Sequence, residues 1–264
     1  MRVWRHGREI DADWANLRAL HYGDGHFTTM RVVHGRIAWW PYHLQRLQEA
    51  NRRLHGRFDD WPILSAQVHA VAANLGQGVL KLMQTRSASQ RGYASHGAQN
   101  EWLMFADPNL PKQAESVQLE WAATRLGHQP ALAGMKHLNR LEQVLARDEQ
   151  PAGRCDDVLM CDLAGDLICT TSANLFVYQD QRWWTPMLDR CGVAGVCRAR
   201  ILELTQVTVA RLNQTELAGA SEVFCCNAVR GIMPVARIGQ QSWPTGPATI
   251  DLMARLQVEL ECAN

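Results

Sequence analysis

The chain has very little lysine, and this scarcity narrows where amine chemistry can occur. Only Lys81, Lys112 and Lys136 are present among 264 residues, although lysine and arginine together number 27. The 27 basic residues nearly balance 26 acidic ones, and no block of one sign stands out. The charge pattern therefore indicates neither a nucleic-acid partner nor an acidic-membrane partner. Any reaction that needs a lysine amine has three candidate residues.

Long apolar runs are also missing. The first residues, MRVWRHGREIDADW, lack the apolar centre of a signal peptide, and no run approaches the roughly 18 residues of a membrane-spanning helix. The composition is 47% hydrophobic and 20% charged, which is enough for a substantial core. We therefore expect a cytoplasmic protein that does not enter a membrane.

The cysteines lack the spacing of a metal site or a disulfide framework. No C-x-x-C pair occurs, and the last histidine of the chain, His137, precedes every cysteine. We expect no metal and predict that most of these thiols are small buried groups in a reducing compartment. The eight residues are Cys155, Cys161, Cys169, Cys191, Cys197, Cys225, Cys226 and Cys262.

Periodicity and turn signals predict two α/β domains with mixed sheets. The prolines within residues 106–116 mark a linker, so we expect a smaller N-terminal domain over residues 1–108 and a larger C-terminal domain over residues 109–264. A cleft between two domains is the usual place for a ligand. The main predicted elements are a hairpin turning at His34-Gly35, helices from Pro41 and over 62–76, a strand over 79–86, a helix over about 137–148, strand pairs within 157–171 and 173–186, a helix over 197–206 and a strand over 222–229.

Lys136 has the setting of a reactive amine. It lies in ALAGMKHLNRLEQVLAR, directly before the predicted helix, whose Leu138, Leu141 and Leu145 share one face. Small or apolar residues precede it, and desolvation increases the fraction of free amine that can attack an aldehyde. The alternative is an ordinary solvated lysine at the start of a helix.

Three further segments are weak signals when taken alone. Arg46, in PYHLQRLQEANRRL, is either a guanidinium that binds a phosphate or a solvated helix residue. The segment GVAGVCRAR (192–200) is a glycine-marked loop that leads into a helix, an arrangement that offers backbone N–H groups to an anion. It matches neither a Walker loop nor G-x-G-x-x-G. Taken alone, the segment CCNAV (225–229) would be assigned to the hydrophobic core at the end of a strand.

In this order, the segments resemble the fold-type IV pyridoxal-phosphate enzymes, a family that contains branched-chain aminotransferases, D-amino acid aminotransferases and aminodeoxychorismate lyases. GDGHFTT together with AGMKHLNRLEQVLAR is most similar to the lyases. The resemblance runs nearly end to end. It covers HYGDGHFTT (21–29), PYHLQRL (41–47), RGY (91–93), the Lys136 segment, SANLF (172–176), TPMLDRCGVAGVCR (185–198) and CNAVRGIMPV (226–235).

The resemblance implies a role for each matching residue. Lys136 would carry pyridoxal 5'-phosphate as a Schiff base and act as general base, and Thr29 or Lys136 would protonate the departing enolpyruvate. Other cofactor contacts implied are Arg46, the backbone amides of Val196 and Cys197, and Ala228, all at the phosphate. The substrate contacts implied are Thr28, Arg91, Tyr93 and Asn227.

The resemblance also implies an architecture and a reaction. We expect two α/β domains with the cofactor at their interface, in a homodimer whose partner loops close the site. The expected activity is that of a carbon–oxygen (oxo-acid) lyase, which cleaves 4-amino-4-deoxychorismate to 4-aminobenzoate and pyruvate in folate biosynthesis. The alternatives are an aminotransferase for branched-chain or D-amino acids, and a protein that binds the cofactor without turnover.

Cys169 is the main departure from the family pattern. The family usually has a glutamate at this position, five residues before the asparagine of NLF, and its carboxylate pairs with the cofactor's ring nitrogen. A thiol is a weak hydrogen-bond partner for that nitrogen. The change is either tolerated in an active enzyme, compensated by Thr170 or Thr171, or a sign of lost turnover. Because an aromatic product drives the lyase reaction, a weaker electron sink favours lyase over aminotransferase.

A second departure lies ahead of the GDG segment. Leu17-Arg18 stands where many relatives have Asp-Arg. We expect a local packing consequence there and no loss of a catalytic group.

Overall fold

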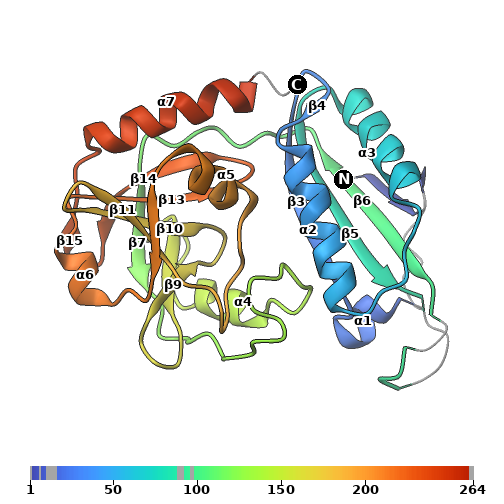
Figure 1. Ribbon diagram of the computed structural model, residues 1–264, viewed down its shortest axis with the longest axis horizontal. Coiled ribbons are helices and arrows are strands. Elements are labelled where there is room, and N and C mark those ends of the chain that lie inside the picture. Colours follow the sequence, from blue (N-terminus) through green and yellow to red (C-terminus); the bar gives the residue numbers. More distant parts are fainter. Residues whose placement is uncertain (1, 6, 10–16, 88–91, 96–97, 262–264) are drawn as a thin grey trace. The chain divides into compact units, whose positions relative to one another are not determined.

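The computed structural model describes residues 2–5, 7–9, 17–87, 92–95 and 98–261. The chain divides into two compact units, each built around its own sheet (Figure 1). The first unit is Met1–Pro111 with Met135–Asn139 and Leu260–Asn264, and the second is Lys112–Gly134 with Arg140–Glu259. The chain first passes between units after Pro111 rather than after residue 108, and the Lys136 segment belongs to the first unit.

The first unit is a six-stranded sheet in the order β2-β1-β6-β5-β3-β4. Its strands are β1 (Arg2–Arg5), β2 (Arg8–Glu9), β3 (Gly25–Val33), β4 (Arg36–Ile37), β5 (Gly78–Arg86) and β6 (Asn100–Asp107), and its helices are α1 (Arg18–Tyr22), α2 (Trp40–Arg53) and α3 (Trp61–Leu75). Every strand pair described in this sheet is antiparallel. The mixed pairing that the sequence predicts is found in the sheet of the second unit instead.

One face of this sheet is covered and forms the core of the first unit. Alternate residues of β3, such as Met30 and Val32, are fully buried, as are Leu80 and Leu82 of β5. They pack with residues of α2 and α3 in one apolar cluster. Because side chains alternate across a strand, the intervening residues lie on the opposite face.

The second unit is a nine-stranded mixed sheet. Its elements are β7 (Val117–Trp121), α4 (Leu141–Asp148), β8 (Asp157–Cys161), β9 (Leu167–Thr170), β10 (Asn174–Gln179), β11 (Arg182–Pro186), α5 (Val196–Leu204), β12 (Val207–Ala210), α6 (Gln214–Ala218), β13 (Glu222–Asn227), β14 (Gly231–Ile238), β15 (Gln241–Ser242) and α7 (Pro247–Glu261). The order is β12-β11-β10-β13-β14-β7-β8-β9, and pairing of β9 with β10 closes part of this path into a ring. The inner side chains of these strands form a second apolar cluster.

The predicted helix after Lys136 begins later than expected. Residues 137–140 are not helical, and α4 starts at Leu141. Instead, the Phe27 N–H donates to the Lys136 carbonyl at 2.9 Å, and the Leu138 N–H donates to the Gly25 carbonyl at 3.0 Å. Backbone pairing with β3 therefore takes this segment out of the helix. The predicted apolar face is largely solvent-facing, since Leu141 and Leu145 are exposed.

The described residues include no helix that is both long and apolar enough to span a membrane.

Candidate active site

Lys136 lies against the sheet of the first unit. Its segment pairs with the start of β3, and His26 and His137 form a bridge between the two strands. The Lys136 Nζ atom is 4.6 Å from the centroid of the Phe27 ring. A ring face attracts an ammonium group and lacks polar atoms that compete for the amine. The GDGHFTT strand thus places the lysine directly, although the two motifs are more than 100 residues apart.

A second lysine, missed by the sequence analysis as a site residue, shares this ring. The Lys81 Nζ is also 4.6 Å from the Phe27 centroid and 5.7 Å from that of Phe105. Burial lowers the pKa of Lys81. The scarcity of lysine was the one available signal, because it left only three residues to consider.

The two threonines of GDGHFTT lie on opposite faces of the sheet. Thr29 follows Phe27 by two residues and pairs in register with Lys81, so all three lie on the sheet face opposite the core. Thr28 is fully buried on the core face, where its hydroxyl lies 2.6 Å from His43 Nδ1. The predicted catalytic role of Thr29 is compatible with this position and stays a prediction. The predicted substrate contact of Thr28 is not favoured, because that hydroxyl is enclosed under α2.

Arg46 lies near the buried contact between Thr28 and His43, close enough for its charge to act on the imidazole. It lies on α2 one turn after His43, and burial lowers its pKa to about 10. Burial and the nearby Arg46 charge lower the pKa of His43 well below its ordinary value, so His43 is neutral. A desolvated guanidinium beside a neutral imidazole is suited to bind an anion.

The RGY segment is described in part. Arg91 lies outside the described residues. Tyr93 is exposed and forms an edge-on ring contact with Tyr22, with centroids 5.5 Å apart. Leu17, the departure next to Arg18, is buried and bridges Ser87, which agrees with the predicted packing consequence.

The second unit offers backbone N–H groups at the start of α5. Gly195 is the N-cap, and no side chain of the described residues caps this helix. The first-turn amides of Val196 and Cys197 have no partner inside the helix by geometry, so they point outward with the positive end of the helix dipole. This is the arrangement expected of an anion site.

Asn174 holds the loop in front of α5. Its side chain accepts a hydrogen bond from the Gly195 N–H at 3.0 Å and donates to the Val193 carbonyl at 2.8 Å. A Cβ atom at Gly195 would lie 2.1 Å from Asn174 Oδ1. Gly134 adds two backbone bonds, one to Gly192 and one from Ala194. The asparagine of SANLF and the glycines of GVAGV are therefore one structural unit.

Two further predicted residues follow β13. Ala228 is buried just beyond the strand end. Asn227 Oδ1 accepts from the N–H groups of Val229 and Arg230, which forms a turn and occupies the oxygen that a substrate would need.

Cys169 is buried and pairs in register with Asn174. The hydroxyl of Thr170 accepts from the Ala173 N–H at 2.9 Å, and that of Thr171 donates to Asp157. Both threonines are thus engaged in the turn, which disfavours them as replacements for the missing carboxylate. Arg140 lies close enough to Cys169 for its charge to interact with the thiol.

Comparison with known proteins gives a consistent result. A model of the family described as amino-transferase class IV matches residues 25–238. The chain is 35% identical over 254 residues to aminodeoxychorismate lyase of Vibrio harveyi, covering 90% of this chain and 93% of that protein. A crystal structure of 4-amino-4-deoxychorismate lyase from Pseudomonas aeruginosa is 38% identical with a TM-score of 0.93, covering 98% of this chain and 99% of that one.

A more distant relative shares the fold alone. The branched-chain aminotransferase of Thermoproteus uzoniensis is 21% identical, with a TM-score of 0.86 over 100% of this chain and 96% of that chain. The resemblance predicted from the motifs is confirmed by these matches. This chain belongs to the class IV aminotransferase family.

Proposed function

We propose that this chain is a pyridoxal-phosphate-dependent lyase that converts 4-amino-4-deoxychorismate to 4-aminobenzoate and pyruvate, a step of folate biosynthesis. Two aminodeoxychorismate lyases match nearly the whole chain at 35% and 38% identity. The observation that carries the proposal is the placement of Lys136 against β3, where Phe27, Thr29 and Lys81 share its face.

The residues fit the cofactor in chemical terms. A phosphate dianion needs backbone N–H groups and a guanidinium, which the first turn of α5 and Arg46 provide within their own units. An aldehyde needs an accessible amine, which Lys136 provides. When bound, pyridoxal phosphate supplies an aldehyde that condenses with amines and a ring that withdraws electrons from the bond to be broken.

Lys136 and Thr29 would move the protons. The Lys136 amine takes the proton from the amine-bearing carbon of the substrate as general base. The Thr29 hydroxyl, on the same sheet face, or the Lys136 ammonium gives a proton to the departing enolpyruvate. Both groups lie beside the apolar Phe27 ring, which limits competition from water.

Lys81 would contribute a positive charge that binds a carboxylate of the substrate. Aminodeoxychorismate carries two carboxylates, and the face that holds Lys136 has a second ammonium 4.6 Å from the same ring. Charge-assisted hydrogen bonds are the usual means of holding a carboxylate. We therefore assign Lys81 to substrate binding, together with Arg91 and Tyr93.

Two properties of the assembled enzyme complete the proposal. We propose a homodimer in which loops of the partner subunit close the site, as the family resemblance implies. We also propose a cytoplasmic enzyme. Seven of the cysteines are buried as free thiols in the described part of the chain, as a reducing compartment allows.

An aminotransferase is the competing function, because such enzymes share the family and the fold. Cys169 argues against it. Transamination requires long-lived delocalisation into the cofactor ring, and no carboxylate stands at this position to keep the ring nitrogen protonated.

The deciding experiment combines a spectrum with an assay. The purified protein should show the visible absorbance of a lysine-bound cofactor. On addition of aminodeoxychorismate, 4-aminobenzoate fluorescence should appear in step with pyruvate. Absorbance without product, followed by a stable pyridoxamine form after an amino acid alone, would instead identify an aminotransferase. A yellow protein inert to every amine would indicate a binder without turnover.

Replacing Lys136 with alanine should abolish both the visible absorbance and the turnover, because the proposal makes this amine both the cofactor attachment point and the general base. Lys112→Ala is the matched control, since Lys112 is exposed and belongs to the second unit. It should leave both readouts unchanged. Product formation by the Lys136→Ala variant at the native rate would refute the assignment.

A further inference from the structure

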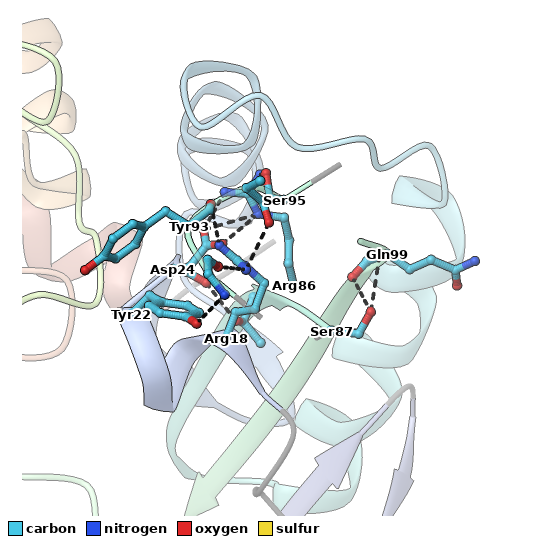
Figure 2. A network of polar contacts seen from close by, with 12 residues as sticks. Arg18, Tyr22, Asp24, Arg86, Ser87, Tyr93, Ser95 and Gln99 are labelled. Carbon is cyan, nitrogen blue, oxygen red and sulfur yellow. Dashed lines mark hydrogen bonds and ion pairs between the residues drawn. The ribbon is translucent and has the colours of Figure 1, made fainter. Parts of the chain in front are cut away.

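Two arginines of the first unit share one carboxylate beneath a surface loop (Figure 2). Arg18 Nε lies 2.7 Å from Asp24 Oδ2, and Arg86 Nη2 lies 2.5 Å from Asp24 Oδ1. All three side chains are largely buried, with exposed fractions of 3%, 10% and 15% for Arg18, Asp24 and Arg86. Burial opposes ionisation of Asp24, but the hydrogen bonds and charges of Arg86 and Arg18 outweigh it and lower the pKa of the carboxyl. We call these three residues the clasp.

The two guanidinium groups and one carboxylate of the clasp leave a net charge of about +1. The surface loop supplies the acceptors for the remaining guanidinium N–H groups. The Arg18 guanidinium donates to the backbone carbonyls of Gly92, Tyr93 and Ala94 at 3.0, 2.9 and 3.3 Å. Arg86 Nη1 donates to the hydroxyl of Ser95 at 2.8 Å. Three consecutive carbonyls turned toward one guanidinium leave the peptide planes of the loop little freedom.

Tyr22 holds the same loop from α1. Its hydroxyl accepts from the Gly92 N–H at 3.0 Å, so both polar groups of that peptide backbone are engaged. The Arg18 guanidinium lies 4.7 Å from the centroid of the Tyr22 ring. Gly92 has a φ of +96°, a conformation that favours glycine, and a Cβ atom there would meet nothing within 4 Å.

The loop is firmly held, yet the side chain it presents is not buried. Tyr93 is 88% exposed, although its own carbonyl is bound by Arg18 (Figure 2). Hydrogen bonds to charged groups are stronger than those between neutral groups, so this loop is held more firmly than an ordinary surface turn. A rigid backbone under an exposed phenol is the arrangement of a preorganised contact residue, because it limits the entropy lost on binding.

We propose that Arg18, Asp24 and Arg86 are positioning residues that hold the loop Gly92–Ser95 so that Tyr93 contacts the substrate. This inference rests on the proposed function, because it takes aminodeoxychorismate as the ligand of Tyr93. None of the three clasp residues is among those assigned to the cofactor or to proton transfer. The effect of the clasp is therefore on substrate affinity rather than on the chemical step.

Arg18→Met is the first test. Asp24 keeps Arg86 as partner, so no buried charge is left unpaired and the variant should fold. Amide hydrogen exchange at Gly92–Ser95 should accelerate, and the KM for aminodeoxychorismate should rise about tenfold with kcat within about twofold, since orientation is lost but not the catalytic groups. The conservative Arg18→Lys variant should recover part of both effects.

A glycine pair separates backbone strain at the loop from general destabilisation. Gly92→Ala strains the loop without a clash, and Gly165→Ala is its match, with a φ of +91° and equally open space in the second unit. Only Gly92→Ala should raise KM. An equal rise in both variants would overturn the proposal, because it would make the effect one of stability.

A double-mutant cycle tests whether the clasp acts through Tyr93. Tyr93→Ala should raise KM, and adding Arg18→Met should raise it little further, because the contact that the clasp positions is already gone. Fully additive effects, or a fall in kcat at constant KM, would contradict the proposal. If the wild-type protein releases no 4-aminobenzoate, the proposed function fails. In that case unchanged exchange at Gly92–Ser95 in Arg18→Met overturns the clasp, whereas faster exchange supports its hold on the loop.

Discussion

His26, on the covered side of the first sheet, makes the fold sensitive to acid. Its side chain is almost completely buried, and this burial lowers its pKa from 6.5 to about 4. The native state therefore keeps His26 neutral at pH values where the unfolded chain is already protonated. Because the unfolded state then binds more protons, stability falls as the pH decreases from about 6.5 to about 4. Burial acts on His43 in the same direction.

The expected loss of unfolding free energy follows from the lowered pKa of His26. At about 1.4 kcal/mol per pKa unit, His26 should remove about 3 kcal/mol of unfolding free energy between pH 7 and pH 4. Urea unfolding at several pH values should show this slope, and His26→Gln should flatten it. His69→Gln is the control, because His69 is exposed on α3. An identical slope in wild type and His26→Gln would exclude this histidine as the cause.

Thr28 and Thr29 show that a shift of one residue along β3 moves a hydroxyl to the other face of the sheet. Thr28 and Thr29 differ only in the face of β3 that they occupy, yet one hydroxyl is enclosed beside His43 and the other shares a face with Phe27. A change of register by one residue would exchange them. The chemistry of the site therefore depends on the register of one strand.

Among the elements, the start of α5 depends on Asn174. Its amide group bonds both Val193 and Gly195, and together these contacts set the direction of the first-turn amides. No side chain of the described residues caps the helix, so the loop conformation alone decides where its N–H groups point.

Asn174→Ala should therefore weaken cofactor binding as well as stability. We expect a loss of about 1–3 kcal/mol in stability from the buried hydrogen bonds, with pyridoxal phosphate affinity lowered about tenfold. Absorbance titration and thermal unfolding measure the two effects. Asn213→Ala is the matched control, because Asn213 caps α6 in the same unit. It should reduce stability by about 1 kcal/mol and leave the affinity unchanged. Unchanged affinity in Asn174→Ala would show that the loop does not depend on this contact.

For the whole molecule, the cofactor should act as a stabilising ligand. Arg46 in the first unit and the start of α5 in the second unit each offer groups suited to a phosphate. A ligand at 100 times its Kd adds about 2.7 kcal/mol to the stability of the native state.

Pyridoxal phosphate should therefore raise Tm, and pyridoxal, which lacks the phosphate, should raise it much less. Arg46→Met should reduce the difference between the two ligands. Lys136→Ala should keep much of the phosphate-dependent shift in Tm, because the protein groups proposed to bind the phosphate are intact in this variant. Scanning calorimetry with each ligand measures this. Equal shifts from both compounds would argue against an anion site at these residues.

Local signals in the sequence were sufficient for much of the architecture. The turn at His34-Gly35, the helix that begins near Pro41 and the strand over residues 79–86 each follow from a few adjacent residues, and all three are present. The long lysine motif indicated the family, which the comparisons show, and predicted Lys136 as the reactive residue. Such features are determined by local sequence because caps, turns and periodicity act over one or two helical turns.

Only the tertiary structure decided how distant residues meet. Lys136 was expected at the start of a helix, but backbone pairing with β3, more than 100 residues away, placed it against Phe27 instead. Lys81 beside that ring and the clasp of Arg18, Asp24 and Arg86 were likewise not predicted. The physical reason is the same in each case. Strand register and the packing of helices on one sheet face select these neighbours, and neither is encoded within a short stretch of sequence.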